Sequence, residues 1–189
     1  SVKGFTHVTE SDLRLKLDWS SFYWLPSDIF GPGKVVVFAQ IFTREGEPHP
    51  SDFRSRLKIY LEELHKKKGY SVMGANEIEG MLVEGVDAEV NFDEKIGFTL
   101  ASSGGYYHSL PMDTLRVFID ATAEAHRALG FENEKDHPEV APSQFELNYK
   151  HSRVDIAADQ IQLYKLVARQ VAENLGMTAT FLPKPVMGI

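Results

Sequence analysis

The spacing of apolar residues along the chain predicts several strands and helices. Between residues 13 and 17, leucines alternate with charged residues, which predicts a half-buried strand or an extended edge. The continuous apolar run at 34–42 follows the turn GPGK and predicts a central strand covered on both faces. A third run, at 71–85, is long enough for another strand and ends at a glycine.

Three other segments repeat apolar residues at helical spacing. The first begins after a capping Ser51 or Asp52 and ends at Gly69, with one apolar side made of Phe53, Leu57, Tyr60, Leu61 and Leu64. The second, at 112–130, aligns Leu115, Phe118, Ile119, Thr122, Ala123 and Leu129. The third, at 155–175, aligns Ile161, Tyr164, Ala168, Val171 and Leu175.

Between the second and third helices, the stretch HPEVAPSQFELNY predicts two short strands joined across Pro142 and Ser143. The order is therefore strands, helix, strand, helix, hairpin, helix. This order predicts an α+β fold, in which helices pack on one face of a sheet.

Composition narrows the classes of protein. The length of 189 residues suits one domain, and the absence of cysteine excludes disulfides and thiolate metal sites. A net charge of -7 with scattered basic residues argues against a nucleic-acid surface. No apolar run reaches the length of a membrane span, and a cytoplasmic location is the default expectation.

Two carboxylates interrupt the apolar pattern in the stretch GANEIEGMLVE. Successive side chains of a strand point to opposite faces, so Glu77 and Glu79 share one face while Ile78 points into the packed layer. Two like charges this close raise each other's pKa unless a cation or strong donors compensate. We therefore expect a positive charge between them.

The predicted hairpin adds further acids. Glu139 and Glu146 would stand on facing strands, with Glu134 and His137 on the approach. Carboxylates and water are the ligands of hard cations, so this set suits Mg²⁺ or Mn²⁺. The alternative is that the Glu-x-Glu pair marks only a solvated strand face, and the residues alone leave both interpretations open.

Several motifs, in this order, resemble one family: NEIEG, GGYYHSLPMD, ENEKDHPEVAPSQFELNY, AADQIQLYKLVARQVA and GMTATFLPKPVMG. Together they resemble the central part of glutamine synthetases, over essentially the whole chain. The resemblance implies that residues 1–12 end or adjoin the N-terminal β-grasp region. It also implies that residues 13–189 form the first portion of the catalytic domain, with a curved, mostly antiparallel sheet. Gly80 stands where the family usually has Phe.

The resemblance also implies residue roles. One cation, near glutamate, would be held by Glu79, Glu139 and Glu146, and Glu77 would bind a second cation that bridges the ATP phosphates. Glu134 resembles the acid that contacts the nucleotide, and the ATP site would be lined by Tyr149, Lys150 and His151, the last replacing a usual aromatic. Tyr106 matches a residue near the ammonium pocket. Ser1 matches a residue that contributes to the pocket of the neighbouring subunit.

The implied activity is the ATP-dependent ligation of ammonia to the γ-carboxylate of L-glutamate through γ-glutamyl phosphate. It would use two Mg²⁺ or Mn²⁺ ions per site, ATP as cosubstrate and a homo-oligomer, expected to be a dodecamer. The alternatives are a γ-glutamyl-amine or polyamine ligase of the same superfamily, and a non-catalytic relative. The chain resembles a fragment, and we expect it to be inactive alone.

Overall fold

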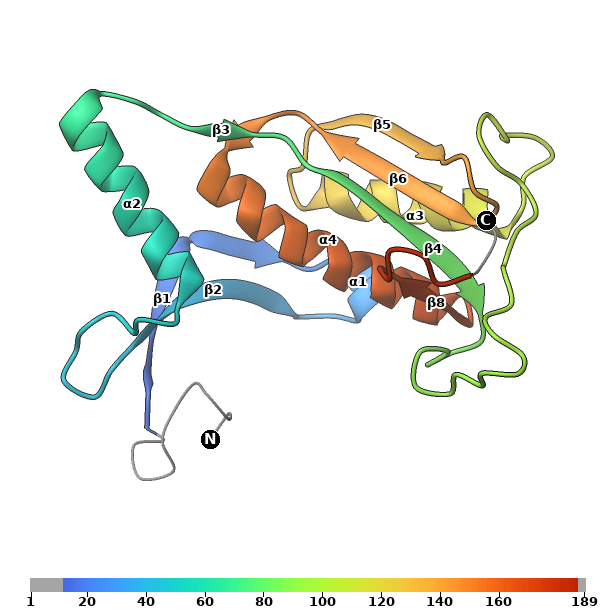
Figure 1. Ribbon diagram of the computed structural model, residues 1–189, viewed down its shortest axis with the longest axis horizontal. Coiled ribbons are helices and arrows are strands. Elements are labelled where there is room, and N and C mark those ends of the chain that lie inside the picture. The colour runs from blue at the N-terminus through green and yellow to red at the C-terminus, as the bar shows by residue number, and fades with distance from the viewer. Residues whose placement is uncertain (1–11, 187–189) are drawn as a thin grey trace.

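A four-stranded antiparallel sheet forms the centre of the computed structural model, which describes residues 12–186 (Figure 1). Its strands lie in the order β5-β6-β4-β8. Their bounds are β4 Glu77–Glu84, β5 Asn133–Pro138, β6 Gln144–Tyr149 and β8 Met177–Thr180. The predicted hairpin is therefore confirmed as β5 and β6, whereas β8, which pairs with the far half of β4, was not predicted.

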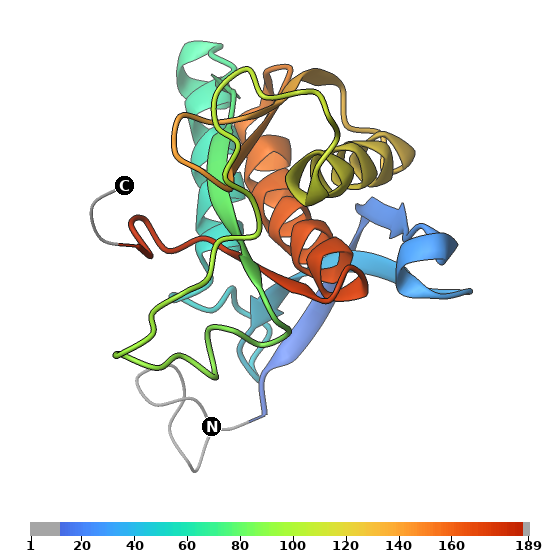
Figure 2. The same cartoon turned by 90° about the vertical axis from the view of Figure 1, so that its right-hand side faces the viewer.

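Two helices, α3 (Thr114–Ala128) and α4 (Val154–Asn174), lie on one side of this sheet (Figures 1 and 2). The helix stripe predicted from Leu115 to Leu129 is buried throughout, and the α4 stripe is buried from Tyr164 to Val171. Asp113 begins α3 by accepting a hydrogen bond from the backbone N–H of Arg116 at 2.9 Å. The predicted α+β fold is confirmed.

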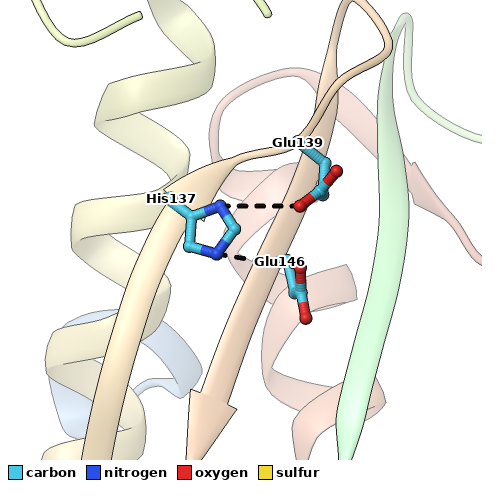
Figure 3. Close-up of side chains that lie close together, drawn as sticks. All are labelled: His137, Glu139 and Glu146. Carbon is cyan, nitrogen blue, oxygen red and sulfur yellow. Dashed lines mark ion pairs between the residues drawn. The ribbon is translucent and has the colours of Figure 1, made fainter. Parts of the chain in front are cut away.

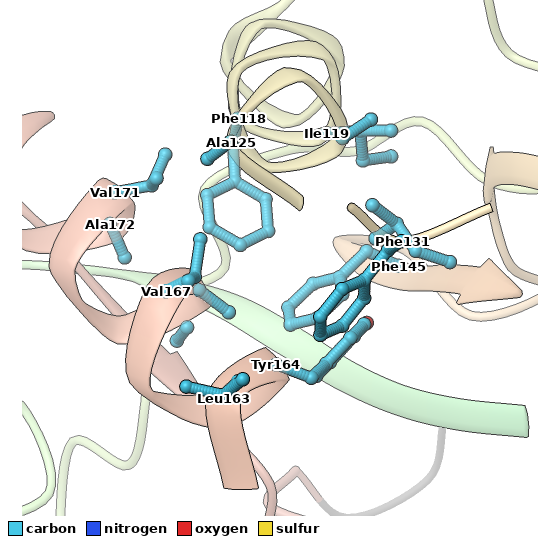
Figure 4. Packing of buried hydrophobic residues seen from close by; sticks show 14 of the residues in the cluster. Phe118, Ile119, Ala125, Phe131, Phe145, Leu163, Tyr164, Val167, Val171 and Ala172 are labelled. Carbon is cyan, nitrogen blue, oxygen red and sulfur yellow. The ribbon is translucent and has the colours of Figure 1, made fainter. Parts of the chain in front are cut away.

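The core lies between these helices and the sheet (Figure 4). Phe118 of α3 packs on Phe145 of β6, with ring centroids 4.7 Å apart. His126 of α3 is fully buried, and its ring stacks between those of Phe131 and Tyr164. Burial lowers the pKa of His126 to about 3, so the imidazole is neutral in the folded protein.

The remaining strands form two smaller units. β1 (Arg14–Trp24) pairs with β2 (Val35–Phe42), next to the short helix α1 (Ser27–Phe30). β3 (Met73–Gly74) pairs with β7 (Ser152–Arg153). The predicted strand at 71–85 is therefore two strands, β3 and β4, in different sheets.

The prediction of a central strand at 34–42 is wrong. Within residues 12–186, β1 is the only strand that pairs with β2, apart from a single bridge between Phe42 and Pro48, and β2 is at most half-buried. The strand predicted around Leu15 and Leu17 exists as β1, but Leu15 is 68% exposed. A continuous apolar run indicates that the side chains of a strand contact other apolar groups. It does not show that other strands pair with it along both edges.

Helix α2 (Phe53–Lys68) begins and ends as predicted, with the Asp52 side chain as its cap and Gly69 after its last residue. It is joined to α4 by a partly buried ion pair, in which Arg54 Nε and Nη2 lie 2.8 and 2.7 Å from the Asp159 carboxylate. Of its predicted apolar side, Phe53 and Tyr60 are exposed. No helix in residues 12–186 is long and apolar enough to cross a membrane.

Candidate active site

The face of the sheet opposite α3 and α4 carries a row of ionisable side chains. Glu79 of β4 lies directly opposite Glu146 of β6, which lies directly opposite His137 of β5. Residues directly opposite one another on neighbouring strands share a face. Three adjacent strands therefore place two acids and one imidazole side by side, and this is the face on which the alternation predicted Glu77 and Glu79.

His137 lies between two carboxylates (Figure 3). Its Nε2 is 3.7 Å from an oxygen of Glu146, and its Nδ1 is 3.9 Å from an oxygen of Glu139. The three potential ligand atoms lie within 4.8 Å of one another. The structure thus brings together the two hairpin acids and the histidine that the sequence placed on the approach.

Glu146 is only 7% exposed, and its environment disfavours a negative charge. Burial raises the pKa of Glu146, and the neighbouring Glu139 raises it further, against the opposing effects of Asn148 and His137. A cation next to these carboxylates would remove this unfavourable interaction. Oxygen donors with one imidazole fit Mg²⁺ or Mn²⁺.

Glu79 and Glu77 stand beside this cluster. The Glu79 carboxylate accepts a hydrogen bond from the side-chain amide of Gln144. Glu77 is exposed and lies opposite Asn148. Gln144 was not singled out in the sequence, although it shares a strand face with Glu146, two residues further along the chain.

Gly80, between Glu79 and Met81, faces the core. A Cβ atom there would lie 2.4 Å from the Phe145 ring. Phe145, directly opposite on β6, therefore fills the space beside Gly80. An aromatic ring from the neighbouring strand takes up the volume at the position where a Phe was expected from the resemblance.

A loop brings aromatic residues to the same cluster. The ring of Tyr106 lies edge-on to His137, with centroids 5.6 Å apart, and packs against Tyr107 at 4.3 Å. Its neighbour Tyr107 and, more weakly, the charge of Glu139 raise the pKa of the Tyr106 phenol. Tyr106 is therefore a neutral phenol near the carboxylates.

The residues predicted to contact a nucleotide are less close together. Glu134 is exposed and lies at an irregularity of β5, between the paired Asn133 and Lys135. Lys150 pairs with Glu132 at 3.1 Å, and His151 is exposed.

Tyr149 is buried in the core, and its hydroxyl bonds to His126 Nδ1. The structure does not support a nucleotide contact through this ring, because the ring fills the space between sheet and helices. Ser1, predicted to serve a neighbouring subunit, lies outside the described residues.

A cavity of about 570 Å³ opens beside Glu79 and Gln144. The hairpin turn at 140–142 lines one side of it, and residues 181–186, which follow β8, line the other. The carboxylate row therefore borders a space large enough for a small-molecule ligand.

Comparison with known proteins identifies the family. The model of the family described as "Glutamine synthetase, catalytic domain" matches residues 50–189. The chain belongs to the glutamine synthetase family. It is 32% identical over its full length to a glutamine synthetase of Methanosarcina mazei and 34% identical to one of Thermus thermophilus.

Solved structures agree on the fold of this family member. A glutamine synthetase of Plasmodium falciparum has a TM-score of 0.80 at 20% identity over 98% of this chain, and a "GmaS/ADP complex" has 0.75 at 24% over 96%. The chain spans 41% and 42% of the length of the two relatives from Methanosarcina and Thermus. Within this span, residues 50–189 are the ones that match the model of the catalytic domain.

Proposed function

We propose that the protein containing this chain ligates ammonia to the γ-carboxylate of L-glutamate at the expense of ATP, giving glutamine. The observation that carries the proposal is the row Glu79–Glu146–His137, joined by Glu139, on the open face of a glutamine synthetase sheet. This constellation meets a requirement of phosphoryl transfer, which is largely achieved by positioning and charge neutralisation.

In this proposal, Glu79, Glu139 and Glu146 hold one divalent cation and Glu77 holds part of a second. When bound, Mg²⁺ or Mn²⁺ neutralises the charge on the phosphate oxygens. Gln144 orients the Glu79 carboxylate through its amide. Tyr106, at the edge of the cluster, lines the pocket for ammonium, and Glu134, Lys150 and His151 face the nucleotide.

The reaction would pass through γ-glutamyl phosphate. A glutamate γ-carboxylate oxygen attacks the γ-phosphorus of ATP and ADP leaves; ammonia then attacks the acyl carbon and inorganic phosphate leaves. The acidic face would attract ammonium, and one of its carboxylates would accept the proton that ammonium must lose before it attacks. A homo-oligomer, expected as a dodecamer, and a cytoplasmic location remain predictions of the family resemblance.

The test is glutamine formation by the full-length protein with ATP, glutamate, ammonium and Mn²⁺. We expect Glu146→Gln to lower the rate by about a hundredfold or more, equivalent to about 2.7 kcal/mol of transition-state stabilisation. Glu84→Gln is the matched control, because Glu84 is an exposed acid at the end of β4, the strand that pairs with β6. Its rate should equal that of the unmodified protein.

The nitrogen substrate is tested in the same assay. Phosphate release with methylamine or putrescine, and not with ammonium, would replace the proposal with an amine ligase. No glutamate-dependent phosphate release with any of these nucleophiles would instead indicate a non-catalytic family member.

A further inference from the structure

The turn of the carboxylate hairpin contains a serine in an unusual backbone conformation. Ser143 lies between Glu139 and Glu146, is fully buried, and has φ of 66°. This left-handed region is one that glycine adopts without strain and that serine adopts at a cost. A serine in this conformation suggests that its side chain makes a compensating contribution.

Each polar group of Ser143 has a partner outside the hairpin. Its Oγ donates to the carbonyl of Leu82 on β4 at 2.6 Å and accepts from the N–H of Ser102 at 3.0 Å. Its own N–H donates to the carbonyl of Gly104 at 3.2 Å, and its carbonyl accepts from the N–H of Leu82 at 2.9 Å. One buried residue thus joins the hairpin turn, β4 and the loop that leads to Tyr106.

The loop is held at its other end by a connected set of bonds. Ser102 Oγ accepts from the N–H of Gly104 at 2.9 Å and donates to the carboxylate of Asp113, the cap of α3. The loop also touches the hairpin directly, because a Cβ at Gly105 would lie 2.9 Å from the carbonyl oxygen of Val140. Tyr106 follows immediately and meets His137.

We propose that Ser143 is a positioning residue: its hydroxyl locks the loop carrying Tyr106 onto the turn of the hairpin that carries Glu139 and Glu146. The position of the aromatic ring relative to the carboxylates then depends on this hydroxyl. The proposal rests on the proposed function only for its effect on ammonium use, since the coupling of loop and hairpin is a property of the fold.

The test compares Ser143→Ala and Ser143→Gly in the full-length protein. Ser143→Ala removes the hydroxyl and keeps the backbone strain, whereas Ser143→Gly removes both. Ser103→Ala is the matched control, since Ser103 is an exposed serine of the same loop. Hydrogen–deuterium exchange of the amides at 104–108 is measured together with the KM for ammonium, kcat and the affinity for Mn²⁺.

We expect exchange at 104–108 to accelerate roughly three- to tenfold in both Ser143 variants, because the loop loses the one hydrogen bond that joins it to the Ser143 hydroxyl. The KM for ammonium should rise by a similar factor, with the affinity for Mn²⁺ unchanged. Ser103→Ala should change neither. If Ser143→Ala does not fold, Ser143→Gly, which relieves the strain, decides alone.

Unchanged exchange at 104–108 in both variants would overturn the proposal. Faster exchange throughout residues 12–186, with kcat and every KM altered alike, would also overturn it, because it would indicate a general loss of stability. A protein that forms no glutamine but shows faster exchange confined to the loop would refute the proposed function and still support the positioning role.

Discussion

The two faces of the central sheet differ in what occupies them, although the same strands build both. On β6, Phe145 and Leu147 point into the core against α3 and α4, while Glu146 and Asn148 point to the opposite face. All four are buried, so burial does not distinguish the faces. The covered face supplies apolar contact and hence stability, whereas the opposite face concentrates charge, which costs stability until a cation binds.

We expect the greatest loss of stability when apolar volume is removed from the face of the sheet that α3 and α4 cover. Phe118→Ala should lower the free energy of unfolding by about 3–5 kcal/mol, because Phe118 is fully buried against Phe145. Denaturant unfolding measures the loss. Val117→Ala, at a 40% exposed neighbour on the same helix, should lose much less. Equal losses would contradict the assignment of the core to this face.

Binding of Mn²⁺ should stabilise the protein from the opposite face. At a free Mn²⁺ concentration of 100 times Kd, we expect about 2.7 kcal/mol of stabilisation, seen as a higher Tm. The shift should disappear in Glu146→Gln and persist in Glu84→Gln. It should also persist in Phe118→Ala, whose Tm is low for a different reason. A shift of the same size in Glu146→Gln would contradict the proposed site.

Lowering the pH should lower the free energy of unfolding, because His126 lies in the core on the covered face. Its pKa in the folded protein, about 3, lies below the ordinary value of 6.5, so folding requires the neutral ring. The contribution of the neutral His126 ring to the free energy of unfolding is fully present above pH 6.5 and is lost progressively as pH falls from 6.5 towards 3. At pH 5 the loss should be about 2 kcal/mol.

The comparison of His126→Phe with the unmodified protein isolates this effect. His126→Phe removes the hydrogen-bond partner of Tyr149, which lowers the free energy of unfolding by the same amount at every pH. The difference in the free energy of unfolding between pH 7.5 and pH 5 should be smaller in this variant than in the unmodified protein. Denaturant unfolding at both pH values measures it. An identical pH dependence in both proteins would show that His126 does not contribute.

The smallest change in stability is expected when a charge is removed from the opposite face of the metal-free protein. Glu146→Gln should slightly raise the free energy of unfolding at pH 7, because burial and Glu139 raise the pKa of this carboxyl and so disfavour its charge. The gain should vanish as pH falls through the raised pKa, where Glu146 is already neutral. Glu84→Gln should give no gain, and a loss at pH 7 in Glu146→Gln would contradict the electrostatic argument.

Elements with a strong local signal were predictable. The period of 3.6 residues located α3 and α4 and their buried sides, and Asp52 with Gly69 marked the ends of α2. Alternation placed Glu77 and Glu79 on one face of a strand, and that face is the one that carries Glu146. These features depend on residues close together in the chain, where spacing determines direction.

Features that depend on distant partners were not predictable from spacing. The short strand β8 is recognised only through its pairing with β4. A central position in a sheet was predicted for β2, which instead belongs to a two-stranded sheet. The buried hydroxyl of Tyr149 bonds to His126, 23 residues away. The bonds that join Ser143 to Ser102 and Leu82 connect segments 41 and 61 residues apart.

The family, the fold class and the two acids that interrupt the apolar run of β4 can all be read from the amino-acid sequence without the structure. Only the folded structure shows that Glu79, Glu146 and His137 form one row and that Ser143 joins the turn beside this row to the loop of Tyr106. The physical reason is that local periodicity sets which way a side chain points, whereas strand register and loop contacts decide what it meets.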